Sequence, residues 1–147
     1  MKYTSEGELL TDIILKTFKL NGLLITEGDQ LIQTLGVSSA RWKVLGALSE
    51  SDHAMTVPDI ARMMGQSRQA VQRLVNEMKQ EGLIETQVNP AHKRSKQLLL
   101  TANGRQMYTS IMYKYTPWIN TLGDEFTSNE LALTASVLLK LINQLEA

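Results

Sequence analysis

The sequence contains no cysteine and only two histidines among its 147 residues. The lack of cysteine excludes disulfides, thiolate zinc sites and cysteine-based redox sensing within this chain. No apolar run approaches the roughly 18 residues that a membrane-spanning helix requires, and the N-terminal residues Met1–Glu6 do not have the pattern of a signal peptide. These absences predict a cytoplasmic protein with no metal site, no cofactor and no membrane contact.

Sequence motifs for catalysis are also missing. The chain has no glycine-rich phosphate loop, no paired-carboxylate motif and no motif of an activated nucleophile. His53, beside Asp52, is expected in a solvated turn, and His92 is expected in a polar turn that faces solvent or phosphate. We therefore predict no catalytic residues, and an enzyme is the least favoured function.

Net charge is zero, because 15 Lys and Arg balance 15 Asp and Glu. The distribution of these charges is nevertheless uneven. Between Arg62 and Arg105 there are eight Lys or Arg against three Asp or Glu, a net charge of +5, so the rest of the chain carries −5. A basic region within an otherwise acidic chain is typical of a surface that contacts nucleic acid.

The middle of the chain has the pattern of two short helices joined by a tight turn, which is typical of a helix-turn-helix. Thr56 is a suitable N-cap for the first helix, Pro58 fits only its first turn, and Gly65 suits its end. Ser67 then caps a second helix, Arg68 to about Gln80. Apolar residues at i, i+3, i+4 and i+7 give this helix one buried face and leave its opposite face polar.

A β-hairpin is predicted directly after the second helix. Leu83–Val88 and Lys96–Thr101 have the composition of short strands, and the polar residues Asn89–Ser95 form the turn between them. A helix-turn-helix followed by a hairpin with a basic tip indicates a winged helix-turn-helix, residues 38–101.

Such a unit predicts binding to double-stranded DNA, with the second helix in the major groove and the wing on the backbone or in the minor groove. Gln69 and Gln72 are expected to contact bases, whereas Ser67 and Arg73 are expected to hold phosphates. The complete set of expected DNA-binding residues is Ser67, Arg68, Gln69, Gln72, Arg73, Asn76, His92, Lys93, Arg94 and Lys96.

Long apolar helices are predicted on both sides of the winged unit. One helix runs from Ser5 to about Leu35, with Gly22 and Gly28 as points of bending or of close helix approach. A shorter helix, capped by Ser38 or Ser39, precedes the helix-turn-helix. After the wing, a helix capped by Thr101 runs to Gly123 and should kink near Tyr113 because it contains Pro117.

The last helix is predicted to begin at a capping box formed by Thr127 and Glu130. Its apolar residues are spaced as in a coiled coil and are Leu131, Ala135, Leu138, Ile142 and Leu145. We therefore expect one mainly α domain, residues 1–147, in which segments 1–35 and 102–147 form a homodimer. A monomeric helical bundle is the alternative. A two-fold dimer would place two recognition helices about 34 Å apart.

Five stretches together resemble the MarR family of transcriptional regulators, and the resemblance covers nearly the whole chain. These stretches are Leu35–Leu45, Ser67–Val75, Glu81–Ile84, Asn89–Arg94 and Leu100–Gly104. The resemblance implies a ligand-responsive repressor that binds a pseudo-palindromic duplex site as a homodimer. In one departure, His92 stands where the family's wing usually has Asp, and an imidazole cannot brace Arg94 by charge as a carboxylate can.

The resemblance also implies a small-molecule effector, often aromatic or phenolic, bound between the winged unit and the dimer helices. Residues suited to line such a cleft are Ile14, Phe18, Trp42, Met112 and Tyr115. Plain core packing is the alternative interpretation of each. For the protein as a whole, the alternative function is a winged-helix module for protein–protein contact, which would not be retained on duplex DNA in a salt-dependent way.

Overall fold

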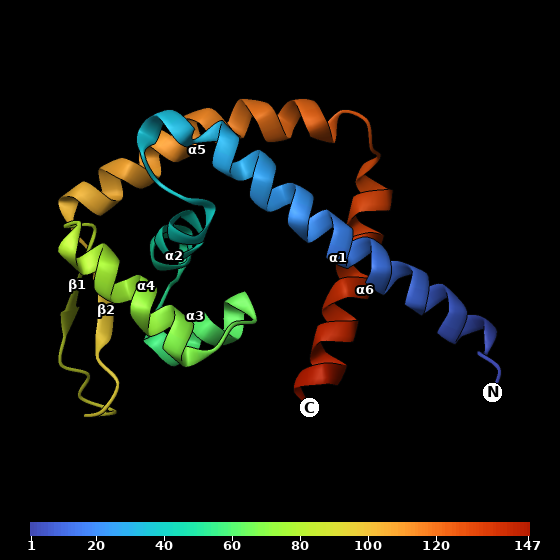
Figure 1. The fold of residues 1–147 in the computed structure, drawn as a ribbon, viewed down its shortest axis with the longest axis horizontal. Coiled ribbons are helices and arrows are strands. Elements are labelled where there is room, and N and C mark those ends of the chain that lie inside the picture. The colour runs from blue at the N-terminus through green and yellow to red at the C-terminus, as the bar shows by residue number, and fades with distance from the viewer. The chain divides into compact units, whose positions relative to one another are not determined.

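The computed structural model describes residues 1–147 and is mainly helical, with one small antiparallel sheet (Figure 1). The elements in order are α1 (Ser5–Leu31), the 3-10 turn η1 (Gln33–Leu35), α2 (Ser39–Glu50), α3 (Val57–Met64), α4 (Arg68–Gln80), β1 (Ile84–Gln87), β2 (Gln97–Leu100), α5 (Ala102–Gly123) and α6 (Ser128–Glu146). The chain divides into two compact units, residues 1–112 and 113–147, and α5 contributes to both. The predicted fold, a winged helix-turn-helix flanked by long helices, is confirmed.

The two helices of the helix-turn-helix begin and end where local signals predict. The Thr56 side chain accepts a hydrogen bond from the Asp59 amide, and the Asp59 carboxylate accepts one from the Thr56 amide, which is a complete capping box. Gly65 ends α3 in the left-handed conformation, with φ of 65°. Ser67 then caps α4 by accepting a hydrogen bond from the Ala70 amide.

The wing is a two-stranded hairpin in which Ile84 pairs with Leu100 and Gln87 pairs with Gln97. In Figure 1 the two strands lie side by side, and the loop between them forms the free end of the hairpin. Met55 forms an isolated bridge with Leu98, which ties the segment before α3 to the sheet. Each strand is one residue shorter at both ends than predicted.

The start of α5 is packed tightly against the start of the hairpin. Thr101 donates its backbone N–H to the Leu83 carbonyl at 3.1 Å, and its hydroxyl accepts a hydrogen bond from the Gly104 amide at 3.0 Å. A Cβ at position 104 would lie 2.2 Å from the Leu83 oxygen, so only glycine fits there. Thr101 therefore caps α5, as predicted.

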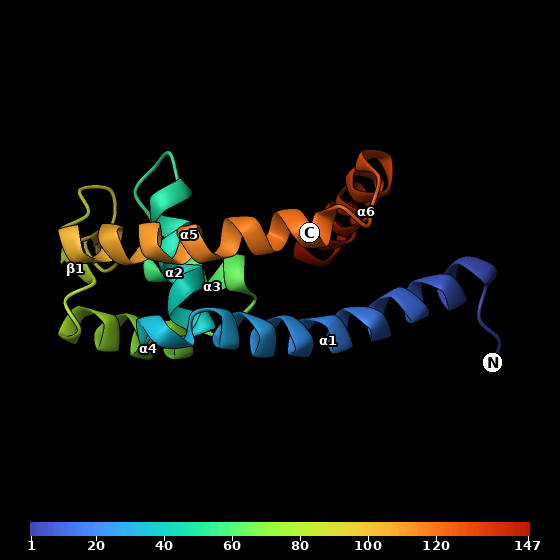
Figure 2. The ribbon, with the colours of Figure 1, turned by 90° about the horizontal axis from the view of Figure 1, so that it is seen from above.

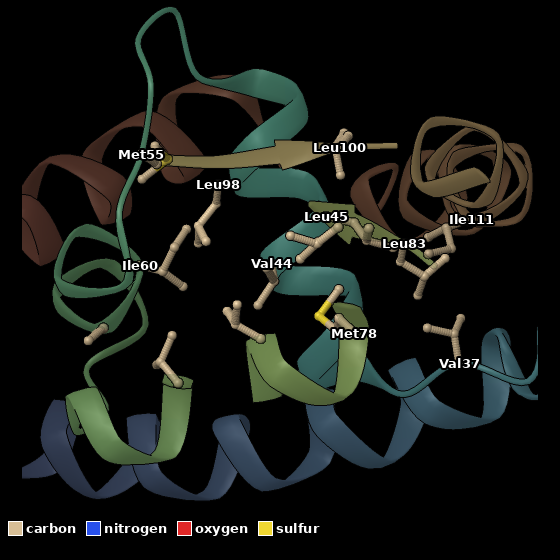
Figure 3. Packing of buried hydrophobic residues seen from close by; sticks show 14 of the residues in the cluster. Val37, Val44, Leu45, Met55, Ile60, Met78, Leu83, Leu98, Leu100 and Ile111 are labelled. Atoms are coloured by element: carbon tan, nitrogen blue, oxygen red, sulfur yellow. The ribbon is translucent and has the colours of Figure 1, made fainter. Parts of the chain in front are cut away.

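The hydrophobic core lies within residues 1–112 and joins α2, α3, α4, the sheet and the first part of α5 (Figure 3). Val44 and Leu45 of α2 are fully buried, as are Ile60 of α3, Met78 of α4 and Ile111 of α5. Burial of a large apolar side chain stabilises the fold by about 1.5–3 kcal/mol. This core packs α4 and the strands of the wing against the same helices.

The expectation of one helix to about Leu35 is wrong, because α1 ends at Leu31 and a 3-10 turn follows. Ile32 leaves the helical path and becomes fully buried in the core. The Asp29 carboxylate accepts the Ser39 backbone N–H at 2.7 Å, which holds the end of α1 against the start of α2. Gly28 marks a close helix approach, as predicted, since a Cβ there would lie 2.7 Å from the Ser39 hydroxyl.

Most of α1 has no cover within its own unit. Its N-terminal half reaches away from α2, α3 and α4 (Figure 2), and Gly28 is its only buried residue. Its large exposed apolar side chains include Leu9, Leu15, Phe18, Leu20 and Leu23.

The second unit contains the end of α5 and all of α6. The α5 helix continues through Pro117 to Gly123, and the kink near Tyr113 stays a prediction. Thr127 caps α6 by accepting the Glu130 amide at 3.1 Å, although the Glu130 carboxylate accepts the Thr127 hydroxyl rather than its backbone amide. No residue of α6 is buried. None of the helices is both long and apolar enough to cross a membrane.

Candidate nucleic-acid interface

The polar face of α4 is the centre of the candidate interface. Val71, Val75 and Met78 point into the core and are fully buried. The alternation of buried and exposed positions turns the opposite face to solvent, and that face carries Arg68, Gln69, Gln72, Arg73, Asn76 and Lys79. The predicted orientation of α4 is therefore confirmed, and its amides and guanidinium groups are exposed to solvent.

A groove of about 510 Å³ lies between this face and the wing. Its lining residues are Val57, Pro58, Arg68, Gln69, Gln72, Asn76, Lys79, Thr86, Arg94, Ser95, Lys96 and Leu98. Six of the ten expected DNA-binding residues thus meet in one concave surface that joins α4 to the wing. The groove is basic, because Arg68, Lys79, Arg94 and Lys96 line it without any Asp or Glu.

A second hollow, of about 450 Å³, lies along the same helix face. It contains Arg73, which the groove does not, together with Gln69, Gln72 and Asn76 and, towards the helix end, Glu77 and Gln80. Gln69, Gln72 and Asn76 border both hollows and therefore occupy the middle of the surface.

Ser67 contributes through the start of α4. Its hydroxyl oxygen accepts the Ala70 amide at 3.1 Å, and its own O–H remains available as a donor. The first backbone N–H groups of a helix have no partner within the helix and attract anions such as phosphate. The start of α4 is exposed and is therefore suited to a phosphate.

The wing tip presents the remaining expected residues. A turn in which Ser95 donates its N–H to the His92 carbonyl at 3.2 Å places Lys93 and Arg94 at the tip, where both are exposed. Arg94 also borders the groove, whereas His92 and Lys93 do not. At the wing tip, Arg94 therefore faces the groove, whereas His92 and Lys93 lie outside it.

A row of side-chain amides holds the base of the wing. Gln87 donates to the Gln97 side-chain oxygen at 2.7 Å, and Gln97 lies 3.5 Å from the Asn89 side-chain oxygen. That oxygen also accepts the Ala91 amide at 3.0 Å, and Asn89 is buried. The wing loop is thus ordered by neutral amides, without a carboxylate at position 92. This role could not be predicted from the sequence, because the alternation of the strands alone does not show which amides meet.

The far end of α4 is fixed by an arginine of α2 that was not among the predicted site residues. Arg41 contacts the carboxylates of Glu81 at 2.7 Å and Glu77 at 3.0 Å. The hydrogen bond with Glu81 and the charges of both acids raise the pKa of Arg41 above its usual range, despite partial burial. These contacts anchor the C-terminal end of the recognition helix to α2.

Several other residues of the groove were not among the predicted site residues. Lys79 lies on the polar face of α4, and its position one turn beyond Asn76 was the available signal. Thr86 and Ser95 belong to the hairpin, and no local pattern indicates that they face α4. The groove's apolar part, formed by Val57, Pro58 and Leu98, depends on the bridge between Met55 and the sheet.

The residues expected to line an effector cleft do not belong to one unit. Ile14, Phe18, Trp42 and Met112 lie in the first unit, and Tyr115 lies in the second. Phe18 is 70% exposed, and Trp42 packs against the edge of the core. No group of three or more His, Asp or Glu side chains is arranged to hold a metal ion.

Comparison with known proteins identifies the same family. The model of the MarR family matches residues 35–95. The uncharacterized protein Rv2011c of Mycobacterium tuberculosis is 36% identical over 135 residues, which cover 92% of this chain and 93% of that protein. The transcriptional activatory protein BadR of Rhodopseudomonas palustris is 25% identical over 142 residues, which cover 95% and 81%.

Solved structures agree in fold over nearly the whole length. The MarR family transcription regulator SP03579 has 26% identity and a TM-score of 0.75, with 96% of this chain and 93% of that chain covered. The S. aureus MepR–DNA complex has 17% identity, a TM-score of 0.75 and coverages of 98% and 99%. CouR from Rhodococcus jostii RHA1, bound to p-coumaroyl-CoA, has 17% identity, a TM-score of 0.79 and coverages of 89% and 92%. This chain therefore belongs to the MarR family of transcriptional regulators.

Proposed function

We propose that the protein is a ligand-responsive repressor that binds a pseudo-palindromic duplex site as a homodimer. The observation that carries this proposal is the basic groove of about 510 Å³ in which α4 and the wing bring together Arg68, Gln69, Gln72, Asn76, Arg94 and Lys96. Amides in the middle suit base edges, and guanidinium and ammonium groups around them suit phosphates.

Each part of this surface has a distinct role in the proposal. Gln69 and Gln72 contact bases in the major groove. The start of α4 at Ser67 and the side chains of Arg68 and Arg73 hold phosphates. Asn76 lies beside Gln72 in the middle of this surface. The remaining expected residues belong to the wing and extend the contact along the backbone and into the minor groove, and these are His92, Lys93, Arg94 and Lys96. The MepR–DNA complex supports DNA binding by a chain of the same fold.

Exposed apolar side chains support the homodimer. Leu131, Leu138, Ile142 and Leu145 of the predicted coiled-coil stripe are all exposed on α6. A soluble monomer rarely exposes so continuous an apolar surface. In a homodimer, segments 1–35 and 102–147 of two chains would cover it, and the two α4 helices would meet successive turns of a duplex.

An aromatic or phenolic effector is the proposed signal. CouR, which has the same fold, is bound to p-coumaroyl-CoA. In the proposal, Phe18, Trp42 and Tyr115 would supply aromatic surface for such a ligand, and Ile14 and Met112 would supply aliphatic surface. The effector would favour an arrangement of the dimer in which the two α4 helices no longer match successive turns of the operator. In vitro transcription from a selected site separates a repressor from an activator such as BadR.

The decisive experiment is selection of duplexes from a random pool by the purified protein. We expect an enriched pseudo-palindrome with half-site centres about 10 base pairs apart and an affinity that falls steeply with salt. Recovery of DNA without any enriched sequence, or no retention at all, would instead favour the protein–protein module.

A further inference from the structure

One hydrogen bond joins two side chains on the exposed face of α4. Gln72 donates from Nε2 to Oδ1 of Asn76 at 2.9 Å, and both side chains are exposed. The two residues are one helical turn apart, the spacing at which side chains on a helix surface meet. Because both residues border the groove and the second hollow, this pair stands in the middle of the candidate interface.

The bond constrains what the pair offers to a partner. A primary amide carries one oxygen acceptor and two N–H donors. Gln72 donates one N–H to Asn76, and its oxygen and its other N–H remain available to a partner. The side-chain oxygen of Asn76 accepts this hydrogen bond. The bond therefore holds the nitrogen of the Gln72 amide towards Asn76 and the oxygen of that amide away from it.

An amide held in this way can distinguish adenine from guanine. In the major groove adenine presents the N6 donor beside the N7 acceptor, whereas guanine presents two acceptors, O6 and N7. An oxygen and an N–H in fixed positions match adenine and repel guanine, because the amide oxygen would then face O6. An amide that is free to turn can instead offer its NH2 group to guanine.

We propose that Asn76 is a positioning residue, which fixes the direction of the Gln72 amide so that Gln72 selects adenine over guanine at one position of each half-site. This inference rests on the proposed function, since it assigns a base preference within the proposed DNA site. Asn76 acts through Gln72 and needs no base contact of its own.

The test compares operators that carry adenine or guanine at the position where Gln72→Ala relaxes selection. The wild-type protein should prefer adenine by about tenfold or more. Asn76→Ala should reduce that ratio at least fivefold, while Asn76→Asp, which keeps an oxygen acceptor, should retain the ratio even though its charge lowers affinity for every duplex. In a Gln72→Ala background, Asn76→Ala should change the ratio no further.

Gln106→Ala is the matched control, because Gln106 is an exposed glutamine on α5 that borders neither the groove nor the second hollow. It should leave the ratio unchanged, and circular dichroism should show that all variants are folded. If Asn76→Ala keeps the wild-type ratio, or alters a different base pair independently of Gln72, the positioning role is refuted although specific binding stands. If the wild-type protein enriches no sequence, the proposed function itself fails.

Discussion

Arg41 of α2 donates two hydrogen bonds to the carboxylate of Glu81, the residue that follows α4. The donors are Nη2, at 2.7 Å from one carboxylate oxygen, and Nε, at 3.0 Å from the other. The Arg41 side chain is only 22% exposed, so solvent screens this pair less than an ordinary surface pair. The start of α4 is fixed by its cap at Ser67 and its middle by the core. Arg41 fixes the end, and the helix direction relative to the wing is then set at three points.

Arg41→Ala should lower the free energy of unfolding by about 1 kcal/mol and weaken binding to a specific duplex more than binding to random DNA. Base contacts depend on the direction of α4, whereas phosphate contacts tolerate small shifts. Arg41→Lys should recover only part of either effect, because an ammonium group cannot make the two-nitrogen contact. Urea denaturation and fluorescence anisotropy measure the two quantities.

Lys43→Ala is the control for this prediction, since Lys43 is an exposed cation on the same helix. An Arg41→Ala protein with wild-type stability and an unchanged ratio of specific to random binding would contradict the role given to Arg41.

Asp29→Asn should remove a pH-dependent part of the stability. The backbone N–H of Ser39, and then its hydroxyl, hold the pKa of Asp29 below its ordinary value of 3.8. A carboxyl with a lowered folded-state pKa stabilises the protein above its unfolded pKa, and this stabilisation is lost as the pH falls through the folded pKa. The stability gap between wild type and Asp29→Asn should therefore be present at pH 6 and shrink as the pH falls below the ordinary pKa of 3.8.

The size of that gap should be about 0.3–1 kcal/mol, as for a carboxylate at an exposed helix start. Denaturant titrations across the pH range measure it, and Glu27→Gln serves as the control for removal of one acidic charge near the end of α1. A gap that stays constant with pH would contradict the prediction.

The winged unit could be predicted from sequence because its determinants are local. The Thr56 cap with Asp59, the stop at Gly65 and the apolar spacing along α4 each act within a few residues. The end of α1 could not be predicted in the same way. Its apolar spacing continues through Leu35, but the burial of Ile32 and the contact between Asp29 and Ser39 end the helix earlier.

The candidate site divides along the same line. The exposed face of α4 follows from helical periodicity, so its arginines and amides were predictable. Arg41 and Glu77 are 36 residues apart in the chain, and the amides at the base of the wing meet only after the hairpin has formed. Contacts of this kind depend on tertiary packing, and a single sequence carries no local signal for them.

Ile142→Asp should weaken or abolish the proposed homodimer. Ile142 lies on the predicted coiled-coil stripe and is 49% exposed within one chain. If a second chain covers this position, the carboxylate of Ile142→Asp would be buried without a partner, which destabilises the dimer. Affinity for a palindromic site should fall by about 100-fold, because the two half-sites are then bound independently.

Light scattering after size exclusion measures the oligomeric state of this variant. Asn143→Asp adds the same charge at the adjacent, exposed position and should remain dimeric. If the Ile142→Asp variant is still a dimer and binds the palindromic site with wild-type affinity, the dimer interface lies elsewhere.

Arg94→Ala should weaken binding to most duplex sequences and reduce the slope of log affinity against log salt by about one. Arg94 is exposed at the wing tip and borders the groove, so it can reach the backbone or a narrow minor groove, where negative potential is concentrated. Arg94→Lys should recover the salt slope but less of the affinity. Titrations at several salt concentrations test this, and an unchanged slope for Arg94→Ala would remove Arg94 from the interface.

His92 should make the affinity for DNA depend on pH. A histidine changes its charge between about pH 5 and 8, and DNA phosphates near the wing tip favour the charged form. Binding should therefore take up protons, and affinity should rise as the pH falls from about 8 to about 6 at fixed ionic strength.

Because the amides of Gln87, Gln97 and Asn89 hold the base of the wing, His92→Gln should leave the wing folded and flatten this dependence. His92→Asp should also lose the pH dependence, while its carboxylate lies close enough in sequence to brace Arg94. Superimposable affinity curves for wild type and His92→Gln would show instead that His92 faces solvent in the complex.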